Sequence, residues 1–183
     1  MKKNYSLLSK VRKLFFFSLY YILFKHFPSS SFMLLGPFSK KMRYLCCKNF
    51  FHRCGHHVNI DRNVSFGTGF GLEIGDNSGI GKNGSVPSNL KIGRDVMIGP
   101  DIKIFASNHK FENINIPIRM QGSSPPLVTT IEDDVWIGAN VLILPGRTIR
   151  KGSIIAAGTV LTKDFPEYSI VGGNPSRLIR SRL

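Results

Sequence analysis

The sequence predicts an all-β solenoid, a stack of very short parallel strands that one extruded loop interrupts. Three observations predict this fold. Aliphatic residues recur at every sixth position, Gly, Asn or Asp follows them, and the count breaks once, between residues 105 and 128. Twelve positions in two registers hold only Ile, Val or Leu: Ile74, Ile80, Val86, Ile92, Ile98 and Ile104, then Ile131, Ile137, Ile143, Ile149, Ile155 and Leu161.

The residues after each aliphatic position decide between helix and strand. Six is a multiple of both two and three, so the spacing alone leaves both open. Typical runs are Ile74-Gly75-Asp76-Asn77 and Ile137-Gly138-Ala139-Asn140. A glycine inside a helix costs about 1 kcal/mol, whereas Gly, Asn and Asp tolerate turns. Hexapeptide repeats belong to parallel β-helices, and a β-sandwich would need strand signals every 8 to 12 residues or so.

Charge and pattern divide the chain into three parts. Residues 1–57 form a basic, aromatic-rich extension, residues 58–162 form the repeat domain with the loop 105–128, and residues 163–183 form a C-terminal tail. Residues 1–60 hold eleven of the 25 Lys and Arg residues and none of the 11 Asp and Glu residues. The repeat domain is therefore nearly balanced in charge, and the excess lies in the extension.

The extension is suited to a membrane surface. The uncharged run Leu14 to Phe24 is too short to span a bilayer, which needs about 20 residues, and no good signal-peptide cleavage site follows it. A second apolar patch begins at Phe32. Basic residues flank the two apolar segments, and the segment Met1 to Lys13 before the first of them is itself basic. Such segments bind anionic lipid surfaces. The alternative is a helical pair that packs on the end of the solenoid, as a capping element would. The two are compatible, and they favour a cytoplasmic protein at the inner face of the membrane.

Three cysteines lie in this region, and their odd number without framework spacing argues against disulfides. The cysteines and nearby histidines are Cys46, Cys47, Cys54, His52, His56 and His57. Their spacing matches no zinc pattern, so we expect reduced thiols in the cytosol and no metal.

Three motifs carry chemistry. They are Ser107-Asn108-His109 at the start of the loop, Val135-Trp136-Ile137-Gly138-Ala139 in the second register, and Gly173-Asn174-Pro175-x-Arg177-x-Ile179-Arg180 near the end. In this order and spacing, over about residues 58 to 183, the sequence resembles the sugar and xenobiotic O-acetyltransferase branch of the hexapeptide-repeat acyltransferases. The resemblance implies a left-handed β-helix, whereas parallel crossovers are generally right-handed.

The resemblance also implies a reaction. His109 corresponds to the general base, and an ordinary imidazole, which titrates near about pH 6.5, can take the proton of an attacking sugar hydroxyl. The backbone N–H of Ala139 corresponds to the donor for the oxyanion that forms on the thioester carbonyl. The repeats and loop hold no cysteine, so direct transfer is expected rather than an acyl-cysteine intermediate.

Acetyl-CoA is the implied acetyl donor, held between subunits of a homotrimer. The positions that correspond to its binding residues are Ala139, Ala157, Thr162, Lys163, Arg177 and Arg180, and the basic ones are well matched to phosphates. Asn83 corresponds to an acceptor-binding asparagine, and Trp136 is expected to wall the site. The basic membrane-proximal extension suggests an acceptor in cell-surface polysaccharide biosynthesis.

Other functions remain open on the same sequence. The same fold is also compatible with N-acetylation of an amino sugar and with acetylation of serine or an antibiotic. Hydration chemistry as in the γ-class carbonic anhydrases needs several histidines on the solenoid, and only His109 lies beyond residue 57. A non-catalytic binder of membrane or nucleic acid would leave His109 and the Asn174-Pro175 motif without a role, so no nucleic-acid partner is expected.

Overall fold

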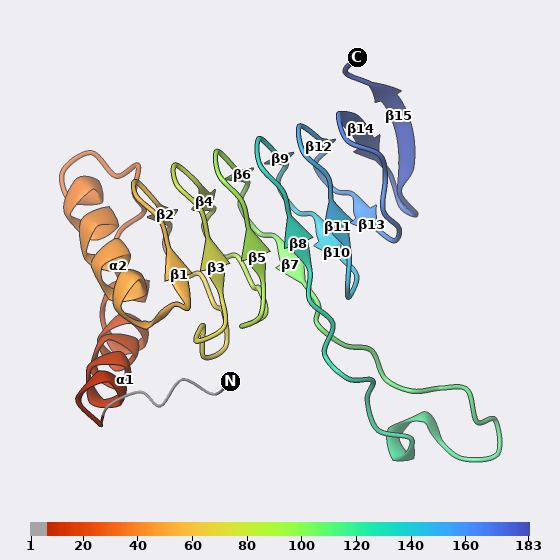
Figure 1. Ribbon diagram of the computed structural model, residues 1–183, viewed down its shortest axis with the longest axis horizontal. Helices are drawn as coiled ribbons and strands as arrows, with labels where there is room; N and C mark the ends of the chain where they lie inside the picture. The colour runs from red at the N-terminus through yellow and green to blue at the C-terminus, as the bar shows by residue number, and fades with distance from the viewer. Residues whose placement is uncertain (1–6) are drawn as a thin grey trace.

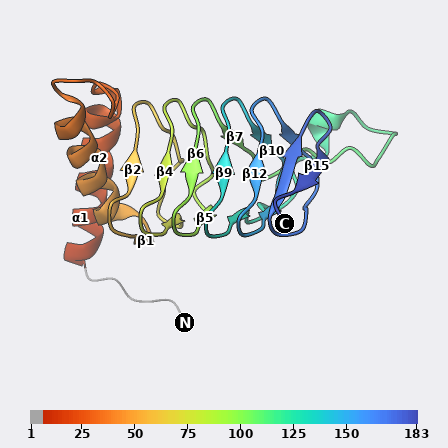
Figure 2. The same ribbon diagram turned by 90° about the horizontal axis from the view of Figure 1, so that it is seen from above.

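The computed structural model describes residues 7–183 as a parallel β-solenoid with a helical cap at one end and an extruded loop (Figure 1). The cap consists of α1 (Leu7–Ile22), the short 3-10 helix η1 (Phe24–His26) and α2 (Gly36–Phe50). Seen from above, the coils stack in register and the cap covers the N-terminal end (Figure 2). The part of the predicted basic N-terminus before Leu7 lies outside the described residues.

Three parallel sheets form the faces of the solenoid, here called faces A, B and C. Face A contains β1 (Arg53–Cys54), β3 (Glu73–Ile74), β5 (Lys91–Ile92), β8 (Thr130–Ile131) and β11 (Thr148–Ile149). Face B contains β2 (Asn59–Ile60), β4 (Gly79–Ile80), β6 (Met97–Ile98), β9 (Trp136–Ile137), β12 (Ile154–Ile155), β14 (Ser169–Gly172) and β15 (Arg177–Ser181). Face C contains β7 (Lys103–Ile104), β10 (Leu142–Ile143) and β13 (Val160–Leu161).

The six-residue period fixes this architecture because each hexad supplies one two-residue strand and the corner after it, and successive hexads lie on successive faces. The second residue of each strand points inward, and all twelve register positions are buried, from Ile137 at 0% exposed to Ile98 at 7%. Register pairs such as Ile98 with Ile137 stack directly above one another. The core is therefore a column of aliphatic side chains along the axis.

The corners explain the Asn and Asp residues of the repeat. Asn77, Asn83, Asp101 and Asn140 all have φ between 57° and 60°, the left-handed region that few residues other than Gly, Asn and Asp tolerate. Some of these side chains also bond between coils: Asn83 Nδ2 donates to Asp101 Oδ1 at 2.9 Å. The corner residues thus supply the backbone turn, and Asn77, Asn83 and Asp101 also contact a neighbouring coil.

An aromatic cluster attaches the cap to the first coil. Tyr20 of α1 and Phe50 of α2 are fully buried and contact the ring of Phe66, with centroids 4.9 and 5.6 Å apart. The Tyr20 hydroxyl donates to the carbonyl of Val64 at 2.9 Å. The alternative that the extension packs on the end of the solenoid is therefore observed for this face of the cap.

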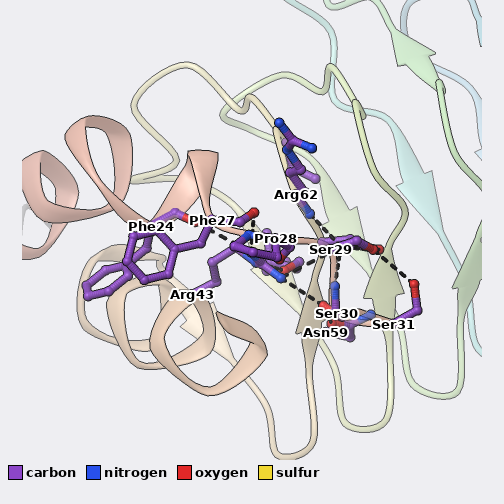
Figure 3. A network of polar contacts seen from close by, with 12 residues as sticks. Phe24, Phe27, Pro28, Ser29, Ser30, Ser31, Arg43, Asn59 and Arg62 are labelled. Atoms are coloured by element: carbon purple, nitrogen blue, oxygen red, sulfur yellow. Dashed lines mark hydrogen bonds and ion pairs between the residues drawn. The ribbon is translucent and has the colours of Figure 1, made fainter. Parts of the chain in front are cut away.

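Arg43 of α2 is the centre of a buried polar network between the cap and the solenoid (Figure 3). Its guanidinium donates to the carbonyls of Ile60 at 2.7 Å and Pro28 at 3.0 Å and to Ser30 Oγ at 2.9 Å, and lies 3.7 Å from Asp61 Oδ1. Burial lowers the pKa of Arg43, and Asp61 opposes that shift. One charged side chain thus joins α2, the turn after η1 and β2.

The solenoid extends beyond the predicted repeat at both ends. Its first strand, β1, begins at Arg53 and pairs with β3, so Val58 lies inside the first coil rather than at its start. After Leu161, Phe165 bridges to Ile149 and β14 pairs in parallel with β12, so residues 163–172 form a further coil. The predicted tail departs from the repeat only at β15, which runs antiparallel to β14.

Within residues 7–183, no helix combines the length and the apolar character needed to cross a membrane.

Candidate active site

The predicted donor-binding alanines lie on one edge of the solenoid, the corner between faces B and C. Backbone hydrogen bonds stack successive coils there: Asp101 N–H donates to the Lys82 carbonyl at 2.9 Å, and Gly158 N–H donates to the Ala139 carbonyl at 2.9 Å. The corner residues in order along the axis are Arg62, Lys82, Pro100, Ala139 and Ala157. We call this row the B–C edge.

The B–C edge is bare at its C-terminal half. Within the described residues, the N–H groups of Ala139 and Ala157 donate no hydrogen bond. Gly158, with φ 73°, has no atom within 4 Å of the point where a Cβ would lie. Free backbone donors beside open space are what an oxyanion or the amides of a pantetheine arm require.

The Asn-Pro motif builds the end of this edge. Ser176 Oγ accepts a hydrogen bond from the N–H of Thr162 at 3.1 Å, and Ser176 N–H donates to the Val160 carbonyl at 3.1 Å. The Asn174–Pro175 peptide is cis. Ser176 was not predicted as a site residue; its burial beside Thr162 is a tertiary feature without a sequence signal of its own.

The predicted phosphate-binding residues are spread over this end. Arg177 follows Ser176 at the turn end of β15, whereas Arg180 pairs with Ile170 farther along the strand. Both are exposed. Lys163 lies over the ring of Phe165, 5.6 Å from its centroid. Thr162 and Lys163 follow β13 at the corner between faces C and A, and Ser176 joins Thr162 to the start of β15 at Arg177, whereas Arg180 lies farther along that strand.

Trp136 lies on the outer surface of face B rather than in the core. Its side chain is 51% exposed, and its strand neighbours on the same face are Met97, 62% exposed, and Ile154. Three residues later the chain reaches Ala139, so the indole flanks the B–C edge. An exposed apolar stripe of this kind is typical of a protein–protein contact or a ligand wall.

Asn83 lies on the same edge, in the second coil. Its side chain accepts a hydrogen bond from Asn63 Nδ2 at 3.1 Å and donates to Asp101 Oδ1 at 2.9 Å. It therefore has a structural part in the corner ladder whatever else it binds, with one amide hydrogen and the outer lone pair of its oxygen left for a ligand.

His109 lies at a different edge. The loop replaces the corner between faces C and A, because β7 ends at Ile104 and β8 begins at Thr130. A short antiparallel pairing holds its base: Ser124 N–H donates to the Asn108 carbonyl at 2.9 Å, and His109 bridges Ser123. In both views the loop projects away from the solenoid toward its C-terminal end (Figures 1 and 2).

His109 is exposed, on a loop that leaves the solenoid at the C–A corner. His109 and Ala139 therefore lie at separate corners of one chain.

The three thiols are remote from both edges. Burial raises the pKa of Cys46 to about 11 and that of Cys54 to about 12, and it also raises the pKa of Cys47. Raised pKa values keep thiols protonated and weakly nucleophilic. Within residues 7–183, no three His, Cys, Asp or Glu side chains gather as metal ligands would.

Comparisons with known proteins agree with this geometry. Residues 129–163 match the family described as bacterial transferase hexapeptide (six repeats). A maltose O-acetyltransferase from Clostridium difficile 630 superposes with a TM-score of 0.74 at 26% identity, covering 96% of this chain and 89% of that one. A galactoside acetyltransferase in complex with coenzyme A gives 0.67 at 26% identity, covering 98% and 84%.

Curated relatives match over shorter stretches. The chloramphenicol acetyltransferase of Agrobacterium fabrum is 46% identical over 62 residues, 34% of this chain and 30% of that protein. The alignments to curated relatives thus span about a third of those proteins' lengths.

Residues 129–163 thus share the hexapeptide repeat of bacterial transferases, and over nearly its whole length the chain is similar in fold to a maltose O-acetyltransferase and a galactoside acetyltransferase. The predicted fold class, a left-handed parallel β-helix with an extruded loop and a helical N-terminal extension, is confirmed.

Proposed function

We propose that the protein transfers an acetyl group from acetyl-CoA to a hydroxyl of a sugar, in the synthesis of a cell-surface polysaccharide. The observation that carries the proposal is the bare B–C edge, with the free N–H groups of Ala139 and Ala157 side by side. The structural neighbours include a galactoside acetyltransferase bound to coenzyme A, which supports the choice of donor.

In this proposal the protein acts as a homotrimer, and each site combines the loop of one subunit with the B–C edge of another. His109 takes the proton of the sugar hydroxyl as its oxygen attacks the thioester carbonyl. The N–H of Ala139 stabilises the tetrahedral oxyanion. When this intermediate collapses, the C–S bond breaks and His109 passes the proton taken from the sugar to the sulfur, so that coenzyme A leaves as the thiol. The separation of His109 and Ala139 on one chain supports this division between subunits.

The donor end of the site makes a testable prediction. Replacing Arg177 and Arg180 with Gln is expected to raise the KM for acetyl-CoA about 10-fold or more, because two guanidinium groups near the nucleotide phosphates are lost. The rate of coenzyme A release measures both constants, and kcat is expected to stay at the wild-type value. A double variant with an unchanged KM would contradict the assignment of these arginines.

The same readout decides between acceptors. A panel of mono- and oligosaccharides, amino sugars, serine and chloramphenicol would be compared by kcat/KM. The sugar proposal expects a hydroxyl-bearing saccharide to be preferred. A preference for an amino sugar, serine or the antibiotic would replace it with the corresponding alternative.

We further propose that the cap contacts an anionic membrane from the cytoplasmic side. Large apolar side chains are exposed on α1 and on the turn before α2: Leu7, Leu8, Val11, Leu14, Phe15, Phe32, Met33, Leu34 and Leu35. Exposed Lys10, Arg12, Lys40 and Lys41 lie among them. Such basic residues near an anionic surface contribute about 1 kcal/mol each, which supports lipid over an uncharged partner.

Substituting exposed residues tests this contact without disturbing the fold. Deleting residues 1–40 would also remove Tyr20 and Phe24 from the core. The double variant Met33→Glu/Leu34→Glu is instead expected to lose sedimentation with vesicles rich in phosphatidylserine, while its melting temperature stays unchanged. Equal binding of wild type and variant, or equal binding to phosphatidylcholine vesicles, would contradict the proposal.

A further inference from the structure

A cavity of about 460 Å³ lies where the cap meets the N-terminal end of the B–C edge. Its lining residues are His26, Arg62, Asn63, Lys82 and Asn83. A second hollow of about 480 Å³ adjoins it and shares His26 and Arg62. The lining of both contains basic and polar side chains and no carboxylate.

The basic groups of this cavity are not used by the fold. The side chains of His26, Arg62 and Lys82 are exposed and, in the described part of the chain, make no hydrogen bond or ion pair. Figure 3 shows the Arg62 guanidinium pointing away from the Arg43 network. These groups are free to bind a ligand.

The carboxylates next to the cavity, Asp61 and Asp101, already accept hydrogen bonds from other groups. Asp61 accepts hydrogen bonds from Ser29 Oγ, at 3.0 Å, and from the backbone N–H of Ser30, at 2.8 Å, and it lies beside Arg43. Asp101 accepts from the Asn83 side chain. Neither lines the cavity, so the positive charge of Arg62 and Lys82 is not neutralised from within.

A hollow of about 430 Å³ on face A shows the opposite arrangement. Its basic residues face acids: Arg94 lies 2.9 Å from Asp133, and Lys91 lies 4.0 Å from Glu73. Arg53 and Lys151 also line it. Its charges are largely balanced, and it therefore serves as the internal control for the cavity at the cap.

The cavity is held in place by the cap. The N–H of Asn63 donates to the Lys25 carbonyl at 2.8 Å, and Lys25 Nζ donates to Ser65 Oγ at 2.8 Å. The residue after Lys25 is His26, so the wall that the cap contributes is fixed against the first coil. A preformed wall binds a ligand without a large ordering cost.

The cavity continues the proposed active site. Lys82 lies two coils from Ala139 along the B–C edge, and Arg62 lies three coils away. At about 4.8 Å per coil, the basic groups are roughly 10–14 Å from the oxyanion donor. In the proposed function the acetyl donor lies toward Ala157, at the other end of this edge, so the cavity end is left to the acceptor.

We propose that the cavity binds an anionic group of the acceptor, a carboxylate or a phosphate, so that the substrate is an acidic oligosaccharide or polysaccharide. This inference rests on the proposed function. Arg62 and Lys82 supply charge-assisted hydrogen bonds, His26 and Asn83 complete the wall, and the acetylated hydroxyl lies on a neighbouring part of the same chain. Arg62 and Lys82 are specificity-determining residues, and His109 and Ala139 carry the chemistry.

The test uses acceptors that differ only in charge. An oligogalacturonate, its carboxyl-reduced form and a phosphorylated neutral oligosaccharide would be compared as acetyl acceptors. Each would be assayed with the wild-type enzyme and with the Arg62→Gln/Lys82→Gln variant. The double variant is expected to raise the KM for the acidic acceptors roughly 10- to 100-fold, with the KM for acetyl-CoA unchanged. Added salt should raise the wild-type KM only for the acidic acceptors. The acid acetylated more efficiently by the wild type identifies the anion as carboxylate or phosphate.

The matched control is Arg53→Gln/Lys151→Gln, which removes the same net charge from the face A hollow. It is expected to leave the KM of every acceptor near the wild-type value. Equal effects of the two double variants, or a wild type indifferent to carboxyl reduction and phosphorylation, would overturn the proposal.

Direct binding separates this proposal from the proposed function. Calorimetric titration of the acidic oligosaccharides into the wild type and both double variants needs no transfer. Binding that Arg62→Gln/Lys82→Gln abolishes and the control retains supports the anion site even if no acetyl group moves. If the enzyme acetylates neutral sugars but does not bind the acidic oligosaccharides, the anion-site proposal is contradicted and the proposed function is not.

Discussion

A His109→Ala variant is expected to lower kcat by about 10²–10⁴-fold while leaving the KM for acetyl-CoA near its wild-type value. The reason is that in the proposed mechanism the imidazole serves only the proton transfer, whereas the B–C edge binds the donor. The loop base is held by backbone pairing between Asn108 and Ser124, so the substitution leaves its geometry intact. Steady-state release of coenzyme A at saturating acceptor measures the effect.

His52→Ala is the matched control, since His52 is also exposed but lies at the cap end of the solenoid. It is expected to keep the wild-type kcat. A His109→Ala protein that acetylates as fast as the His52→Ala protein would remove the general base from the mechanism.

Mixed oligomers test whether the site is shared. His109→Ala chains would be co-expressed with Arg177→Gln/Arg180→Gln chains, and the mixed species purified by two different tags. If the loop of one subunit serves the edge of another, some sites in the mixture are intact, and at acetyl-CoA concentrations well below the KM of the Arg177→Gln/Arg180→Gln protein the activity exceeds that of either variant alone. Absence of rescue in a stable mixed oligomer would argue that each chain completes its own site.

Arg43→Ala is expected to cost about 3–5 kcal/mol of unfolding free energy, the largest stability effect of a single polar substitution in the cap. Removing the guanidinium leaves the carbonyls of Ile60 and Pro28 without their donor and Asp61 without its charged partner, all beside a new cavity. For a chain of this length the melting temperature should fall by roughly 6–20 °C.

Two further variants show that the network, rather than the charge alone, is responsible. Arg43→Lys keeps the charge but lacks the planar fork of donors, so it should recover only part of the loss. Lys41→Ala, exposed on the same helix, should leave the melting temperature unchanged. Equal melting of Arg43→Ala and Lys41→Ala would mean that the network adds nothing to stability.

The repeat was predictable because its physical cause is local. Each strand and corner depends on residues within one hexad: an aliphatic residue such as Ile137 must point inward, and a residue such as Asn140 must tolerate φ near 57°. The extruded loop was predictable for the same reason, since the segment between Ile104 and Ile131 is much longer than one corner and must leave the stack. The coil over residues 163–172 could not be predicted from the repeat. Phe165 and β14 still pair with the previous coil, but their residues no longer follow the six-residue spacing.

The candidate site was only partly predictable. The sequence marked His109, Trp136 and the Asn-Pro motif as unusual, but their roles came from resemblance and stay predictions. The supporting role of Ser176 and the free N–H groups of the B–C edge had no sequence signal, because they depend on which coils lie next to each other. The basic cavity was invisible for the same reason, since His26 and Lys82 are far apart in the sequence.

The sequence by itself determined the solenoid, its period, the position of its loop and the excess of positive charge at one end, because these follow from neighbouring residues. Tertiary structure alone decided that Arg43 joins the cap to the first coil, and that His109 and Ala139 lie at different corners of one chain. It also decided that Arg62 and Lys82 share a cavity with His26. Stacking brings residues about 18 positions apart into contact, and which of them keep free donors and charges depends on every coil between them.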